Sequence, residues 1–188
     1  MQIVHPSTIL ISGPTGSGKT NFVSNLLKFK LIDPFPEKIT WIYGEWQATY
    51  ETLLQLYPFI QFLQGFPPNF YDSLSANFRN LLIIDDQMTE IGDSKELSKL
   101  FTKGSHHMNL SIVYIVQNLF DKGRSMRTVS INSQYIILFK NSRDKSQIAH
   151  LPRQMYPGNS NFLVSSFQDA TDRPFGYLVL DLRPETKE

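Results

Sequence analysis

The chain has 188 residues, of which 41% are hydrophobic, 13% aromatic and 19% charged, and this composition excludes a disordered, collagenous or coiled-coil protein. It contains no cysteine, which excludes disulfides, thiolate catalysis and cysteine-ligated zinc. The formal net charge is only +1, yet residues 95–153 hold ten basic and three acidic side chains. This local excess indicates either a polyanionic partner or a solvated face.

Short apolar, β-branched runs alternate with polar or amphipathic stretches, which is typical of strands buried on both faces of a mostly parallel sheet. Strands are expected at Thr8–Ser12, Ile39–Tyr43, Leu81–Asp85, Ser111–Val116, Tyr135–Lys140 and Tyr177–Asp181. Helices are expected at Lys19–Lys30, Gln47–Tyr57, Lys95–Lys103, Lys145–Gln154 and Asn159–Ala170. This order predicts a single α/β domain over residues 1–188, with right-handed crossovers between strands and helices flanking the sheet.

Two stretches depart from this alternation. The segment around Pro67 and Pro68 is expected to form an irregular connection or subdomain, whose stripe of phenylalanines from Phe59 to Phe70 packs in the core. No apolar run approaches the roughly 18 to 20 residues that a membrane span needs, so no membrane partner is expected.

The sequence Gly-Pro-Thr-Gly-Ser-Gly-Lys-Thr follows the first expected strand and opens the first expected helix. It fits the phosphate-loop (Walker A) pattern G-x-x-x-x-G-K-[ST], in which backbone N–H groups point into one concavity at a helix amino terminus. The expected nucleotide-binding residues are Gly13, Pro14, Thr15, Gly16, Ser17, Gly18, Lys19 and Thr20. Lys19 should reach the β- and γ-phosphates of ATP, and Thr20 should offer its hydroxyl to Mg²⁺. The alternative is a glycine-rich turn with no chemical role.

The expected strand Leu81–Asp85 carries a second motif, because four aliphatic residues end in two acids. Carboxylates at this end of a parallel strand face the same edge of the sheet as the phosphate loop. Asp85 is expected to hold Mg²⁺, directly or through water, and Asp86 to orient and deprotonate the attacking water. A later strand ends in Gln117, whose amide could hold that water against the γ-phosphate. The order of the three motifs predicts a P-loop NTPase with an additional strand between the phosphate-loop strand and the acidic strand.

These motifs resemble the FtsK–HerA superfamily of DNA-pumping ATPases, and more closely its viral branch, the genome-packaging ATPases of poxvirus-like, virophage and Polinton-type elements. Further similar stretches are Ser105–Asn109, Arg127–Asn132 and Leu138–Asp144. The resemblance covers most of the chain from Thr8 to about Pro157. It implies a RecA-like ATPase that acts as a homo-oligomeric ring, a hexamer or pentamer, and pushes double-stranded DNA into a capsid or portal vertex. The expected location is the viral replication or assembly site inside the host cell.

The resemblance also directs attention to residues outside the three motifs. The superfamily often has Glu as its second acid where this chain has Asp86, so Glu45, just past the second strand, is the reserve catalytic base. Ring ATPases usually receive an arginine from the neighbouring subunit, for which the candidates are Arg124, Arg127 and Arg143. The expected DNA-binding residues are Lys103, His106, His107 and Lys122, with both histidines in a loop before the strand Ser111–Val116.

Three other functions remain open from the sequence. A helicase of replication or recombination would use the same chemistry on single strands. A nucleotide-binding switch would bind ATP and turn it over slowly, and a nucleoside or nucleotide kinase would transfer the phosphoryl group to a small acceptor.

Overall fold

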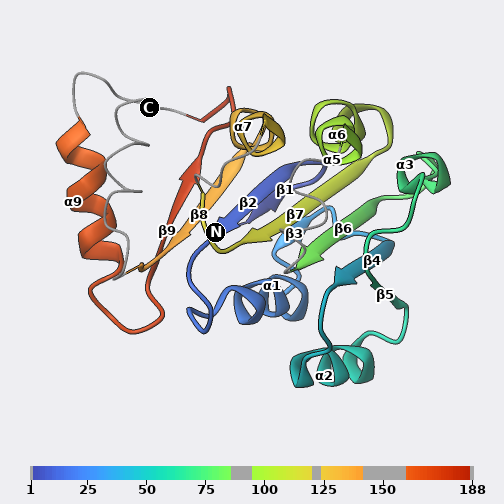
Figure 1. Ribbon diagram of the computed structural model, residues 1–188, viewed down its shortest axis with the longest axis horizontal. Coiled ribbons are helices and arrows are strands. Elements are labelled where there is room, and N and C mark those ends of the chain that lie inside the picture. Colours follow the sequence, from blue (N-terminus) through green and yellow to red (C-terminus); the bar gives the residue numbers. More distant parts are fainter. Residues whose placement is uncertain (1, 86–94, 120–123, 142–159, 187–188) are drawn as a thin grey trace.

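The computed structural model describes residues 2–85, 95–119, 124–141 and 160–186 (Figure 1). Within these residues the main sheet has seven strands in the order β5-β4-β6-β7-β2-β8-β9, and all neighbours are parallel except β8 and β9. The strands are β2 (Thr8–Ser12), β4 (Lys38–Tyr43), β5 (Ile60–Gln64), β6 (Asn80–Asp85), β7 (Leu110–Val116), β8 (Tyr135–Phe139) and β9 (Tyr177–Asp181). A second, two-stranded parallel sheet pairs β1 (Ile3–Val4) with β3 (Ile32–Asp33).

Helices cover both faces of the main sheet (Figure 1). One face packs against α1 (Lys19–Lys28) and α2 (Ala48–Leu56). The opposite face packs against α5 (Lys95–Lys99), the π-helical turn η1 (Leu100–Gly104), α7 (Arg124–Ile131) and α9 (Ser160–Ala170). The short helices α3 (Phe70–Ser73) and α6 (Ser105–His107) precede β6 and β7. The expected α/β class with a mostly parallel sheet is therefore confirmed.

The two helical layers explain why the central strands are continuous apolar runs. In β6, Ile83 packs in the cluster that contains α1 and α2, whereas Leu82 packs in the cluster that contains α5 and α7. Both side chains are 0% exposed. Because successive side chains of a strand point to opposite faces, a strand covered on both faces needs apolar residues at every position.

The strand order confirms one further expectation. The third-motif strand β7 lies between the phosphate-loop strand β2 and the acidic strand β6, which is the expected additional strand. The six expected strands form within two residues of their predicted bounds. The expected helix Lys145–Gln154 lies outside the described residues.

Several expectations for the connections are wrong. The segment before Pro67 is not irregular, because Ile60–Gln64 pairs with β4 as the edge strand β5. Phe59 is 53% exposed and does not belong to the core, whereas Phe70 is buried. The helix expected to end at Lys103 continues through η1 and α6, so His107 lies on a helix rather than in a loop. In the described part of the chain, no helix combines the length and apolar character that a bilayer crossing requires.

We expect that shortening a buried side chain of β6 lowers the stability of the protein, whichever face of the sheet the side chain lies on. Leu82→Ala and Ile83→Ala should each lower the free energy of unfolding by about 2–5 kcal/mol, because each removes a fully buried side chain and leaves a cavity. Phe29→Ala is the control, since Phe29 is 61% exposed and its loss should cost under about 1 kcal/mol. Denaturant unfolding of the three variants measures the difference. Equal, small effects in all three would contradict the two-sided burial of β6.

Candidate nucleotide-binding site

The phosphate loop connects β2 to α1 through residues 13–18, and two of its glycines are required by geometry. Gly18 caps the amino terminus of α1 with a φ of 101°, in the left-handed region that side chains disfavour. A Cβ on Gly13 would lie 2.6 Å from the Cβ of Phe139 and 2.8 Å from the Ser17 hydroxyl. The loop therefore lies directly against the end of β8, with no room for a side chain at its first position.

The Lys19 ammonium lies across this loop. Its Nζ donates hydrogen bonds to the carbonyl oxygens of Gly13, at 2.6 Å, and Pro14, at 2.9 Å. The Ser17 hydroxyl is buried and has no hydrogen-bond partner among the described residues. Helix α1 begins at Lys19, so the N–H groups of its first turn and the positive end of its dipole point at the same place. An anion such as a phosphate would be stabilised here.

The acidic strand meets the phosphate loop through Asp85, the last residue of β6. Asp85 is 3% exposed, and its carboxylate accepts hydrogen bonds from the Thr20 hydroxyl, at 3.1 Å, and from the Tyr50 hydroxyl, at 2.8 Å. Thr20 and Asp85 thus present two oxygen ligands side by side, the donor type that Mg²⁺ prefers. Mg²⁺ usually takes one or two protein oxygens and completes its shell with phosphates and water. Among the described residues, no group of three or more acidic, histidine or cysteine side chains could hold a metal ion. Thr20 and Asp85 match a site in which Mg²⁺ takes only two oxygens from the protein.

The register of the sheet brings the other strand ends to the same edge. Asp85 pairs with Ile115 of β7 and with Tyr43 of β4, and the Gly13 N–H donates to the Val116 carbonyl at 3.2 Å. Gln117 follows β7 directly and is exposed. Glu45 follows β4 by two residues and is also exposed. Both side chains therefore leave the sheet at the edge that carries the phosphate loop.

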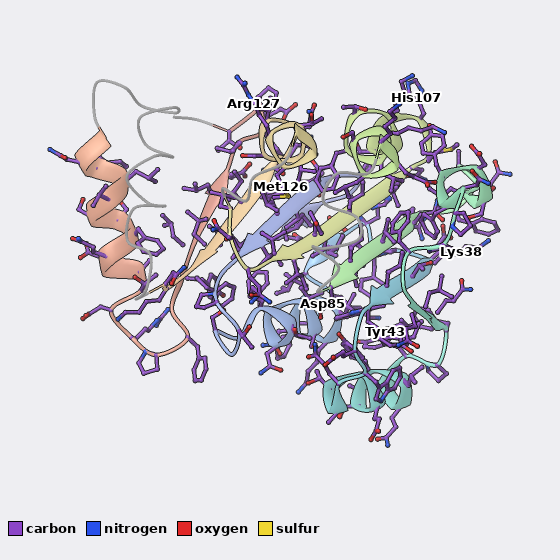
Figure 2. The ribbon with its side chains drawn as sticks, viewed as in Figure 1. Lys38, Tyr43, Asp85, His107, Met126 and Arg127 are labelled. Carbon is purple, nitrogen blue, oxygen red and sulfur yellow. The ribbon has the colours of Figure 1, made fainter. Side chains whose placement is uncertain are left out.

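The remaining expected site residues divide into two groups. Asp86, Lys122 and Arg143 lie outside the described residues, as do the side chains of His106 and Arg124. Lys103, His107 and Arg127 are described and exposed. Figure 2 shows His107 and Arg127 on the helices above the sheet, away from Asp85. Neither of these two side chains lies beside Asp85.

The site also contains residues that the sequence motifs do not indicate. A pocket of about 200 Å³ opens at the loop and is lined by Gly16, Gly18, Lys19, Thr20, Asn21, Gln47, Thr49 and Phe175. Gln47 and Thr49 come from the start of α2, so two helix amino termini converge on this pocket. Tyr50 and Phe175 have no motif around them. Gln47 follows β4 by four residues, and it reaches the site because β4 pairs with β6, which no motif indicates.

Comparison with solved structures finds the same fold in viral packaging enzymes. The genome packaging NTPase B204 from Sulfolobus turreted icosahedral virus 2 in complex with sulfate has a TM-score of 0.64 and 14% identity, covering 96% of this chain and 93% of that one. Its complex with ATP-gammaS has a TM-score of 0.63 at 14% identity, covering 96% and 94%. A KaiC-like protein from Pyrococcus horikoshii has a TM-score of 0.50 and 18% identity, with 71% of each chain covered. The expected likeness to packaging ATPases is confirmed, and the fold is that of a RecA-like P-loop NTPase.

Sequence comparison points in the same direction over a shorter stretch. "Packaging protein 1" of Snake adenovirus serotype 1 is 43% identical over 42 residues, which are 22% of this chain. The match spans 10% of that protein's length. No family model matches the chain.

The contact between Gly13 and Phe139 generates a prediction. Gly13→Ala should lower the free energy of unfolding by about 1–3 kcal/mol and displace the loop, because the new methyl group would overlap the backbone-proximal carbon of Phe139. Thermal unfolding measures the first effect, and binding of sulfate or an ATP analogue measures the second. Gly65→Ala is the control for backbone strain without a clash: its φ of 71° disfavours alanine, a cost that Gly13→Ala does not carry, but no atom lies within 4 Å of its Cβ position. A Gly13→Ala protein with wild-type stability and binding would contradict the packing described here.

Proposed function

We propose that this chain is an ATPase that moves double-stranded DNA, and that it acts as the motor of viral genome packaging in a homo-oligomeric ring at the capsid or portal vertex. The observation that carries the proposal is the 3.1 Å hydrogen bond between Thr20 of the phosphate loop and Asp85 of the acidic strand. It joins the two halves of a phosphate and metal site within a fold shared with packaging NTPases. The packaging-protein match over 42 residues supports the viral setting.

In this proposal the loop residues 13–20 bind the ATP phosphates through backbone N–H groups, and Lys19 exchanges its loop carbonyls for the β- and γ-phosphates. Thr20 and Asp85 hold Mg²⁺, which when bound neutralises charge developing on the phosphates. Gln117 orients the attacking water. Asp86 accepts the proton from that water, with Glu45 as the alternative base at the same sheet edge.

The ring and the DNA engage other surfaces. Lys103 and His107 are exposed on the continuous helix α5–η1–α6 and, with His106 and Lys122, are proposed to contact the DNA backbone. Arg127 lies on α7, in the layer across the sheet from α1. We propose that one of Arg127, Arg124 and Arg143 is supplied to the phosphate loop of a neighbouring subunit.

The test is the ATP hydrolysis rate of the full chain, measured alone, with duplex DNA and with single-stranded DNA. Duplex DNA should stimulate the rate, and Lys19→Ala should lower the rate by on the order of 10²-fold or more by removing the cation aimed at the phosphates. Stronger stimulation by single strands would favour the helicase. Tight ATP binding with negligible turnover would favour the switch, and DNA-independent transfer of phosphate to a nucleoside would favour the kinase.

Tyr50 supplies a second prediction for the same site. Tyr50→Phe should raise the Mg²⁺ concentration that gives half-maximal hydrolysis by about tenfold or more, because the hydroxyl orients the carboxylate that holds the cation. The rate at saturating Mg²⁺ should change much less. Tyr57→Phe is the matched control, since its hydroxyl makes an equivalent 2.9 Å bond to the Leu27 carbonyl, away from Asp85. Equal Mg²⁺ dependence in both variants would remove Tyr50 from the site.

A further inference from the structure

A second hollow adjoins the phosphate-loop pocket. It has a volume of about 260 Å³ and shares Gly18, Asn21 and Phe175 with that pocket. The two hollows therefore meet at the amino terminus of α1, and the Phe175 side chain lines both of them. A ligand with phosphates on the loop has room to extend into the second hollow without leaving the surface of the protein.

The floor of the second hollow is aromatic. The ring of Tyr177 lies 4.9 Å from that of Phe22 and 5.3 Å from that of Phe139, measured between centroids. Asn21 and Asn25, one turn apart on α1, line the rim with exposed side chains. An aromatic lining with amide groups beside it suits a flat aromatic ligand that carries hydrogen-bonding atoms on its perimeter.

Phe175 is held over this hollow in an unfavourable conformation. Its φ is 58°, which is uncommon for a non-glycine residue and costs on the order of 1 kcal/mol or more. Its side chain is 70% exposed, and its ring packs on no other ring among the described residues. The aromatic carbon Cδ1 lies 3.4 Å from the position of a Cβ on Gly18. The chain thus keeps a large apolar ring exposed and strained beside the phosphate loop.

Gly176, the residue after Phe175, restrains the backbone conformation of Phe175. A Cβ on Gly176 would lie 2.4 Å from the Ala170 carbonyl oxygen and 2.9 Å from the Thr171 Cα, so this glycine is pressed against the end of α9. The Gly176 N–H also donates to the Arg173 carbonyl at 3.1 Å. The turn that carries Phe175 is therefore anchored at Gly176, which restrains the position of the ring beside the hollow.

We infer that the second hollow binds the base of a nucleoside triphosphate, with the Phe175 ring stacked on one face of the base. The inference rests on the proposed function, because the phosphates of the same molecule occupy the loop. A purine should bind better than a pyrimidine, since it offers the larger face to the ring and to the aromatic floor. Each asparagine amide both donates and accepts, so Asn21 and Asn25 can meet adenine or guanine, and discrimination between these two bases should be weak.

The experiment compares ligands with and without a base by calorimetric titration: ATP, GTP, CTP and inorganic triphosphate. Wild-type protein should bind ATP and GTP similarly and CTP more weakly. Phe175→Ala and Phe175→Leu should lose roughly 10- to 100-fold in affinity for the two purine nucleotides, the range found when a stacking ring is removed. Their affinity for triphosphate should stay unchanged. Phe162→Ala is the control, because Phe162 is a 65% exposed ring on α9 outside both hollows.

The outcomes distinguish a failure of the base site from a failure of the proposed ATPase function. Unchanged ATP affinity in both Phe175 variants overturns the base site while leaving the ATPase intact. An equal loss for ATP and triphosphate also overturns it, because Phe175 would then only support the loop. Wild-type protein that binds none of the four ligands, or a Lys19→Ala protein that binds triphosphate as well as wild type, refutes the proposed function instead.

Discussion

The hydrogen bond from the Thr20 hydroxyl to the Asp85 carboxylate connects the phosphate loop to the centre of the sheet, and the rest of the site is arranged around it. Asp85 is buried at the end of β6, where an unpaired carboxylate would be costly. Thr20 and Tyr50 satisfy it from two helices on the same face of the sheet. The carboxylate thereby holds α1 and α2 in a common position, and their amino termini converge on one pocket. Removing the Asp85 carboxylate would leave both hydroxyls without the partner that they share.

Phe139 links the two ends of the proposed nucleotide site. Its Cβ excludes any side chain at Gly13, and its ring forms part of the floor beneath Phe175. The last residue of β8 is therefore in contact with the phosphate loop and with the base hollow at once. Since β8 is hydrogen bonded to β2 along four residue pairs, Phe139 is held in position relative to β2 and the phosphate loop that follows it.

The sequence alone predicts the secondary structure and the site residues wherever a local pattern determines them. The apolar run of Thr8–Ser12 and the glycine pattern after it predict both the strand and the loop, because burial and backbone conformation there depend on nearby residues. The edge strand Ile60–Gln64 could not be found this way, since its mixed apolar and glutamine pattern forms a strand only by pairing with β4. Tyr50 lies 35 residues before its partner Asp85 in the sequence. Phe175 lies 157 residues after Gly18, which it faces in the structure. Such contacts follow from the tertiary packing and have no local signature.

Strand β7 begins two residues after α6, which ends at His107, and finishes at Val116, whose carbonyl accepts the Gly13 N–H of the phosphate loop. Its seven residues span about 23 Å, all are buried, and it is hydrogen bonded to β6 on one side and β2 on the other. A strand enclosed in this way cannot slide by a small amount, because its register and its alternating faces allow only two-residue steps. β7 is therefore a rigid connection between α6 and the phosphate-loop edge of the sheet. If the proposed ring forms, a displacement at α6 would reach that edge by movement of the sheet as a unit, without any change in β7 itself.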